Sequence, residues 1–230
     1  MNSPELWEHS TPDPVAVELP LFPLGTLLAP GGRLPLRVFE PRYVRLLRTV
    51  LDPATGTREF GVVGIRQGHE VGPATSATPV SLFAVGCTAH IDHLAANGES
   101  EFALLTTGRR RFELAGFHEA AGTPYLTGLV RYLNEPLGDP ERALERRAKA
   151  RIELTRYLEV LGGPDIDLPE DPVAASYRIA ELNRLSLADR AELLAAATAE
   201  HRLALAARVL RREWTLFTRL RAVPWAGPTS

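Results

Sequence analysis

The chain has one cysteine and one lysine among its 230 residues, and each scarcity excludes a class of chemistry. Because Cys87 is alone, no intramolecular disulfide can form. Lys149, in the stretch RRAKARIE, has no glycine near it, so it is not the lysine of a G-x-x-x-x-G-K-[ST] phosphate-binding loop. Arginines flank this lysine and no serine is near it, which argues against a serine–lysine dyad, since such a base must be desolvated. A G-x-S-x-G nucleophile motif is also missing.

Long apolar runs and a strong excess of one charge are missing too. No apolar stretch approaches the roughly 18 residues that a membrane-spanning helix needs. Residues 1–15 lack the charged and apolar regions of a signal peptide, and we expect them to form a flexible tail. The formal net charge is −2, which argues against an obligate nucleic-acid or membrane-surface protein. We therefore expect a cytoplasmic protein without a membrane partner.

Residues 16–138 are predicted to form a β-rich subdomain. Short segments of Val, Leu, Phe, Thr and Tyr are separated there by Gly, Asn and Pro, which is the pattern of strands and turns. The stretch AANGES predicts a hairpin turn, because Asn97 and Gly98 both tolerate positive φ. After two opening strands, the expected strands lie in 59–66, 80–94, 101–117 and 125–133.

The opening of this half holds five prolines between residues 18 and 43. Proline cannot donate to a sheet ladder, so it is confined to strand starts, edges and bulges. We therefore expect two short bent strands, Val17–Phe22 and Leu34–Phe39, at the rim of a small barrel and joined by the APGG turn. Pro41 then begins a helix that Glu40 caps.

Residues 139–221 are predicted to form a four-helix subdomain, followed by a flexible tail at 222–230. The first helix is capped by Asp139, begins at Pro140 and ends at Gly162. It places one stripe of residues on a single face: Leu144, Ala148, Ile152, Thr155 and Leu158. The other three helices are expected to begin at Asp171–Pro172, at Ser186 and after Thr198.

Several motifs together resemble a known family. The stretch LPLFPLGTLLAPGGRLPLRVFEPRY resembles the opening of the amino-terminal (LON) domain of Lon protease. VGCTAHI at Val85–Ile91, the Gly108-x-x-Arg111 strand and the closing LNRLSLADRAELL helices resemble later parts of that domain, so the likeness covers residues 16–214. The resemblance implies an α+β fold, a PUA-like β pseudo-barrel followed by a C-terminal helical bundle. This agrees with the strand-like pattern predicted for residues 16–138 and the helical pattern predicted for residues 139–221.

The resemblance also implies a function. It indicates a stand-alone LON-domain protein that lacks the ATPase and protease domains, is not an enzyme and needs no cofactor. The expected partners are unfolded or degron-bearing polypeptides, or a protein partner, bound in the groove between barrel and bundle. Two alternatives stay open, an RNA-binding PUA-like module and a hydrolase of unrecognised type, and so does the oligomeric state.

Two stretches supply candidate binding residues. RVFEPRY mixes aromatic, acidic and basic side chains, and its Phe39, Glu40, Arg42 and Tyr43 are the candidates for partner binding. GRRRF supplies the candidates for nucleic-acid contact, Arg109, Arg110 and Arg111. Strand alternation is expected to put the first and third of these arginines on one face and Arg110 on the other.

No catalytic residue or metal ligand is assigned. Cys87 is expected to be a buried strand residue, because free cysteines usually are. His90 and His93 are three apart, which puts them on opposite faces of a strand. The acidic stretch DIDLPEDP is explained by the cap at Asp171 and the dipole of the helix that follows. Trp225, in the tail, is expected either to dock on the body or to contact a partner.

Overall fold

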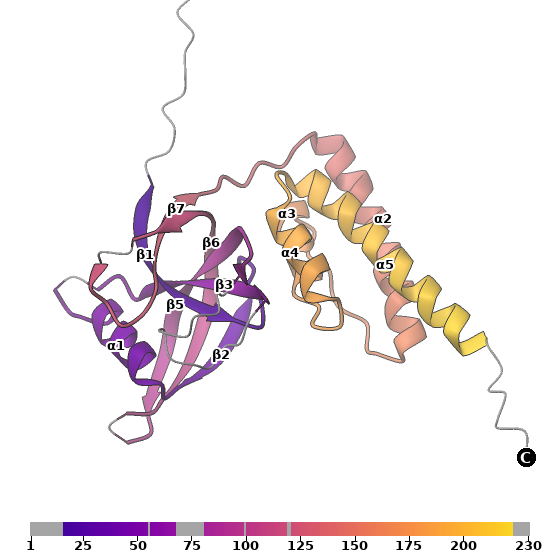
Figure 1. The fold of residues 1–230 in the computed structure, drawn as a ribbon. Coiled ribbons are helices and arrows are strands. Elements are labelled where there is room, and N and C mark those ends of the chain that lie inside the picture. The colour runs from indigo at the N-terminus through magenta and orange to yellow at the C-terminus, as the bar shows by residue number, and fades with distance from the viewer. Residues whose placement is uncertain (1–15, 55, 68–80, 99, 119–120, 223–230) are drawn as a thin grey trace, which may run out of the picture.

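The computed structural model describes residues 16–54, 56–67, 81–98, 100–118 and 121–222, with the strands first and most helices last (Figure 1). The predicted tails lie outside these residues apart from residue 222, and Trp225 lies outside them as well. The α+β class is confirmed, and the change from strands to helices falls between Tyr132 and Pro140. The elements are β1 (Val17–Leu24), β2 (Arg33–Val38), α1 (Pro41–Val50), β3 (Glu59–Gln67), β4 (Ser81–Leu82), β5 (Val85–Ala96), β6 (Phe102–Phe117), β7 (Thr127–Tyr132), α2 (Pro140–Leu161), α3 (Pro172–Ala180), α4 (Leu187–Ala195) and α5 (Ala199–Ala222).

The strands form one sheet whose path returns on itself. The order is β1-β7-β6-β5-β3-β4, and β1 pairs with β3 in parallel in addition to pairing with β7. β2 and β4 lie off this ring, since β2 pairs only with β6 along the described strands. The sheet is therefore neither open and flat nor a regular barrel. The expected pseudo-barrel is a ring of β1, β7, β6, β5 and β3, with β2 and β4 attached outside it.

The prolines of the opening lie where a sheet tolerates them. β1 changes partner along its length: Val17–Pro20 pairs with β7 and Leu21–Leu24 pairs with β3. Pro35 lies in β2, which is an edge strand. Both opening strands were therefore expected correctly, with ends that differ by one or two residues from the structure.

Helix α1 packs its apolar face into the largest cluster of the β half. Tyr43, Val44, Leu46, Leu47 and Val50 are buried there, together with side chains from β1, β2, β3, β5 and β6. No helix in the described part of the chain combines the length and apolarity that a bilayer span needs.

The helices α2 and α5 run side by side in the same direction. The Asp139 amide donates to Glu200 near their starts, and further along Arg211 and Trp214 donate to Glu153. The Asp139 cap and the left-handed Gly162 end of α2 are confirmed.

The stripe predicted to define α2 is wrong for two of its larger members. Leu144 and Ile152 are 57% and 53% exposed. The buried positions are instead Ala143, Ala150, Glu153, Leu154, Tyr157 and Leu158. The two faces have similar spacing, and the face that packs includes Ala143 and Ala150, which are fully buried.

The helical half meets the sheet through α3 and α4, while α2 and α5 lie farther from the strands (Figure 1). The contact holds a small apolar cluster that includes Leu27, Ala29, Tyr177, Ala191 and Leu194. Beside it, Arg190 donates to the carbonyl of Ala180 at the end of α3 and to that of Leu27 in the loop after β1, both at 3.0 Å. The side chain of Arg190 therefore links the end of α3 to the strand half through two hydrogen bonds.

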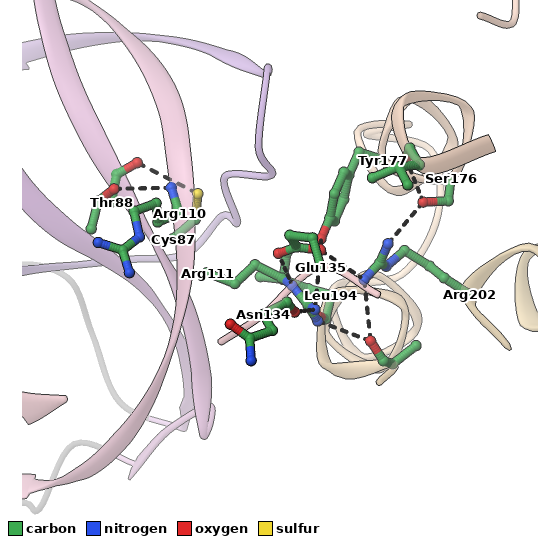
Figure 2. A network of polar contacts seen from close by, with 12 residues as sticks. Cys87, Thr88, Arg110, Arg111, Asn134, Glu135, Ser176, Tyr177, Leu194 and Arg202 are labelled. Atoms are coloured by element: carbon green, nitrogen blue, oxygen red, sulfur yellow. Dashed lines mark hydrogen bonds and ion pairs between the residues drawn. The ribbon is translucent and has the colours of Figure 1, made fainter. Parts of the chain in front are cut away.

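Arg111 of β6 makes the central polar contact between the halves (Figure 2). Its side chain is 1% exposed and donates five hydrogen bonds. Two go to the carbonyls of Leu194 and Ala196 at the end of α4, at 2.6 and 2.9 Å. The others go to Glu135 and to the Asn134 carbonyl in the segment after β7. A cation at the carboxyl end of a helix is favourable, because unpaired carbonyls concentrate negative charge there.

A second buried arginine completes this network. Arg202 of α5 is fully buried and donates to the Leu193 and Ala196 carbonyls and to Ser176, while its guanidinium lies 4.0 Å from the centre of the Tyr177 ring. Burial lowers the pKa of Arg202 to about 10, so it remains charged at neutral pH. Burial, with the hydrogen bond that its hydroxyl donates to Glu135, raises the pKa of Tyr177.

The expected alternation of the three arginines on β6 is wrong because the strand contains a β-bulge. Cys87 pairs with Arg111 and Ala89 with Gly108, so Thr88 faces two residues, Arg109 and Arg110. Both of these are exposed, and the bulge turns Arg111 inward.

Gly108 explains the other half of the Gly-x-x-Arg motif. A Cβ at this residue would lie 2.1 Å from the carbonyl oxygen of Ala29, so only glycine fits. Its amide donates to the Gly32 carbonyl, and its own carbonyl accepts from Gly31. The motif therefore seats the APGG turn on β6 and, three residues later, reaches the helices.

We predict that Arg111→Lys lowers the free energy of unfolding by about 3 kcal/mol, because an ammonium cannot make the forked contacts. The buried carbonyl of Leu194 loses its charged donor, and Glu135 keeps only its contacts with Tyr177 and Arg202. Urea unfolding followed by circular dichroism measures the change. The control is Arg109→Lys on the exposed side of the bulge, expected to change stability by less than about 0.5 kcal/mol. Equal midpoints for the two variants would contradict the role given to Arg111.

Glu153 is a buried carboxylate between α2 and α5. It is 1% exposed and accepts hydrogen bonds from Arg211 and Trp214. Burial alone would raise the pKa of Glu153, but the hydrogen bonds from Arg211 and Trp214 and the charges of Arg211 and Arg156 outweigh it and lower the pKa. A carboxyl with a lowered folded-state pKa stabilises the fold above its unfolded-state pKa, and that stabilisation is lost as pH falls through the folded-state pKa.

We predict that Glu153→Gln costs about 2 kcal/mol of unfolding free energy at pH 7, and that this difference from the wild type shrinks as pH falls below about 4. Urea unfolding at pH 7, 5, 4 and 3 gives the two curves. Glu192→Gln, which changes an exposed pair with Arg208, should show a small difference at every pH. A Glu153→Gln difference that does not vary with pH would refute this assignment.

Candidate functional site

A hollow of about 120 Å³ opens where β1, β2 and the start of α1 meet. Apolar side chains provide most of its lining, and two charged residues join them. The lining residues are Phe22, Pro23 and Leu24 from β1, Leu36, Arg37 and Val38 from β2, and Phe39, Glu40 and Tyr43 from the turn into α1.

The local sequence explains why a large aromatic side chain stands at the mouth of this hollow. β2 ends at Val38, which is buried, and Glu40 keeps an extended backbone at the N-cap before Pro41 begins the helix. Between them Phe39 turns outward and is 60% exposed. A single exposed apolar side chain is ordinary, but Phe39 adjoins an apolar hollow, and such a contiguous apolar surface is typical of a binding site.

The inner wall of the hollow is held rigidly. The rings of Phe22 and Tyr43 stack at 3.9 Å between centroids with 10° between their planes, and Phe60 packs against Phe22 at 5.8 Å. Phe22 and Tyr43 are 6% and 5% exposed. The wall is therefore a fixed aromatic surface that joins a strand to a helix.

The rim of the hollow carries paired charges. Arg42 donates to Glu40, at 3.0 Å from Nε and 2.8 Å from Nη2, and its guanidinium lies 4.6 Å from the centre of the Tyr43 ring. Arg37 donates to Glu101 across the β2–β6 pair. Glu40 occupies the N-cap position of α1 as expected, although its carboxylate binds Arg42 instead of a backbone amide.

The four residues predicted for partner binding are therefore brought together by the fold. Phe39, Glu40 and Tyr43 line the hollow, and Arg42 pairs with Glu40 at its rim. Their role in binding stays a prediction. Sequence reasoning missed the β1 and β2 side of the hollow, although the LPLFPL and LPLRV stretches hold all six of those residues. They were interpreted only as strands.

The expected groove between the strand and helix halves is not where this hollow lies. That contact is packed by the cluster around Leu27, Tyr177 and Leu194 and by the buried arginines. The hollow instead belongs to the β half and to α1 alone.

The three candidate arginines for nucleic-acid contact are separated by the bulge. Arg111 is buried between the halves and cannot reach a phosphate, which corrects its assignment. Arg109 and Arg110 are exposed, and the guanidinium of Arg110 stacks 3.8 Å from the centre of the Tyr132 ring.

The remaining candidates match their structural interpretation except for the pair of histidines. Cys87 is fully buried, and burial raises the pKa of its thiol, so the reactive thiolate is disfavoured. His90 pairs with Thr107 and His93 with Leu105, so the bulge between Ile91 and His93 puts both histidines on one face of β5, and the expected opposite faces are wrong. His90 lies 3.7 Å from Glu59, and His93 is exposed. Asp171 caps α3 by accepting from the Ala174 amide. Among the described residues, no group of three or more His, Cys, Asp or Glu is arranged to hold a metal ion.

We predict that the inner wall and the mouth of the hollow differ sharply in what they contribute to stability. Tyr43→Ala should cost about 3–5 kcal/mol of unfolding free energy, because it removes a buried stacked ring. Phe39→Ala should change it by less than about 0.5 kcal/mol, since most of that ring is already in water. Chemical unfolding of both variants measures this. A large loss for Phe39→Ala would show that Phe39 is a core residue rather than a binding surface.

Known proteins share both the sequence pattern and the fold. The family model of the ATP-dependent protease La (LON) substrate-binding domain matches residues 18–212. Over 159 residues the chain is 28% identical to Lon protease 2 of Myxococcus xanthus, a match that covers 69% of this chain and 17% of that protein. The chain thus spans about 17% of the length of this curated relative.

Two solved structures are similar to the chain over most of its length. The Lon N-terminal domain protein from Xanthomonas campestris has a TM-score of 0.56 and 25% identity, and the match covers 90% of this chain and 99% of that chain. The N-terminal domain of the Lon protease from the Mycobacterium avium complex has a TM-score of 0.57 at 16% identity, with 86% and 98% covered, which is a likeness of fold.

Proposed function

The chain belongs to the family of LON substrate-binding domains, and from this premise we propose that it is a non-catalytic module that binds unfolded or degron-bearing polypeptide. The binding surface is the hollow between β1, β2 and α1. The observation that carries the proposal is Phe39, 60% exposed at the mouth of a hollow whose inner wall is fixed and apolar.

The size of the hollow suits one apolar side chain. A dry cavity of about 150 Å³ in another protein binds benzene, and this one measures about 120 Å³. Burying a leucine or phenylalanine contributes about 1.5–3 kcal/mol. Micromolar affinity requires about 8 kcal/mol. The hollow therefore acts as an anchor for one residue, and the rest of the affinity comes from contacts along the bound chain.

The chemistry of the lining supports binding better than hydrolysis. Its titratable residues are Arg37, Glu40 and Tyr43, and the two charged ones are each engaged in an ion pair. A hydrolase needs a nucleophile or a base placed beside a stabiliser of developing charge. For RNA, the exposed pair of Arg109 and Arg110 is a narrow basic surface on a chain of net charge −2.

We predict that the protein binds a permanently unfolded probe, fluorescein-labelled α-lactalbumin with reduced and carboxymethylated cysteines, with a Kd in the micromolar range. Phe39→Ser should weaken this binding about fivefold to tenfold, because it removes apolar area that is buried only in the complex. Fluorescence anisotropy titration gives both constants.

The matched control is Leu144→Ser, which removes an apolar side chain of similar exposure, 57%, from α2. It should leave the Kd unchanged. Equal weakening in both variants would mean that any exposed apolar side chain suffices and would reject the hollow as the site. Failure of the wild-type protein to bind the probe would reject the proposed function.

A further inference from the structure

Among the described residues, one edge of β2 has no partner strand. Along the described strands β2 pairs only with β6, in antiparallel register from Arg33 opposite Thr107 to Val38 opposite Phe102. An unpaired edge presents a row of backbone N–H and C=O groups that can pair with another extended chain. β2 is therefore a place where a further strand can be added.

The register tells which backbone groups point to that free edge. The Gly108 amide donates to the Gly32 carbonyl, which lies opposite it one residue before β2 begins. In an antiparallel pair, backbone groups point toward the partner at every second residue. Gly32, Leu34, Leu36 and Val38 therefore face β6, while Arg33, Pro35 and Arg37 turn their backbone groups outward. Pro35 is one of the residues whose backbone groups point away from β6. This agrees with the register, because a proline has no N–H to donate to a neighbouring strand.

The same edge adjoins the hollow. Leu36, Arg37 and Val38 form one of its sides, and Phe22, Pro23 and Leu24 of β1 form the other. β1 and β2 do not pair with each other along the described strands. The hollow thus lies between two strands that do not pair, and the side chain of Leu36, which lines it, is only half buried.

We propose that an extended polypeptide segment binds by adding a strand to the free edge of β2, with one apolar side chain placed in the hollow beside Phe39. This inference rests on the proposed function and gives its mode of recognition. Backbone pairing is independent of sequence, so it suits a ligand defined by its lack of fold. It also supplies the contacts along the bound chain that the hollow alone does not.

A second copy of this chain is a poor occupant of the same edge. Two β2 strands paired about Pro35 would place Arg33 of each copy opposite Arg37 of the other. Like charges directly opposite one another destabilise a strand pair. Pro35 also offers the incoming strand an acceptor without a donor, so the edge favours a short foreign segment over an extended self-pairing.

The test on the protein compares Arg37→Pro with Arg37→Ala. Both variants lose the side chain and its ion pair with Glu101, so the ratio of their Kd values reports the outward N–H of residue 37. Binding of labelled carboxymethylated α-lactalbumin should be at least about tenfold weaker for Arg37→Pro than for Arg37→Ala, because the proline removes a donor and places its ring at the edge. Circular dichroism and the urea midpoint establish that both variants are folded.

A test on the ligand does not depend on the folding of any variant. The probe is a labelled seven-residue peptide that alternates threonine with valine and carries a central phenylalanine. Successive N–H groups of a strand point to opposite edges. N-methylation at one alternate set of residues should therefore abolish binding to the wild-type protein, whereas methylation at the other set should change the Kd less than threefold.

The outcomes separate the two proposals. If the wild type binds carboxymethylated α-lactalbumin, but Arg37→Pro matches Arg37→Ala and both methylated peptides bind alike, strand addition is overturned and the proposed function stands. If the wild type binds neither the protein probe nor the peptide, both fail. Protection of the Arg33 and Arg37 amides from hydrogen exchange on binding, with no change at Asp52, would support strand addition.

Discussion

The fold of this chain depends on one buried guanidinium. Arg111 leaves a strand, crosses the contact between the two halves and binds the carbonyls that end α4, while the same fork holds Glu135. The carbonyls at the end of a helix are costly to bury without donors, and arginine is the side chain that supplies five N–H donors in a fixed geometry. The chain relies on arginine throughout, and Arg190 and Arg202 bind helix-end carbonyls in the same way.

The hollow is a product of how the strands are paired. The first half of β1 pairs with β7 and its second half with β3, and within the described part of the chain β2 pairs only with β6, so β1 and β2 do not pair with each other. Helix α1 fills most of the gap, with Tyr43 stacked on Phe22. What α1 leaves uncovered is the hollow, and Phe39 stands at its mouth because the chain turns from strand to helix there. The apolar hollow thus lies where the strands β1 and β2 meet the start of helix α1.

Sequence reasoning succeeded where the determinant is local. The caps at Asp139, Asp171 and Ser186 and the helix end at Gly162 depend on a few neighbouring residues, and each was predicted. It failed where a distant partner decides. The face of α2 depends on the approach of α5, so Leu144 and Ile152 looked like core and Ala143 did not. A single bulge opposite Thr88 reversed the direction of Arg111. The candidate residues of RVFEPRY were found because they are contiguous, whereas the facing β1 wall comes from another segment.

The scarcity of lysine has a practical consequence for labelling. Lys149 is the only side-chain amine of the chain, and it is exposed on α2, which packs on α5 rather than on the strands. An amine-reactive dye on Lys149 would report the slower tumbling of a complex without contacting the hollow between β1 and β2. Amine-directed crosslinkers, in contrast, would find only guanidinium groups along β2 and would miss a chain held at that edge.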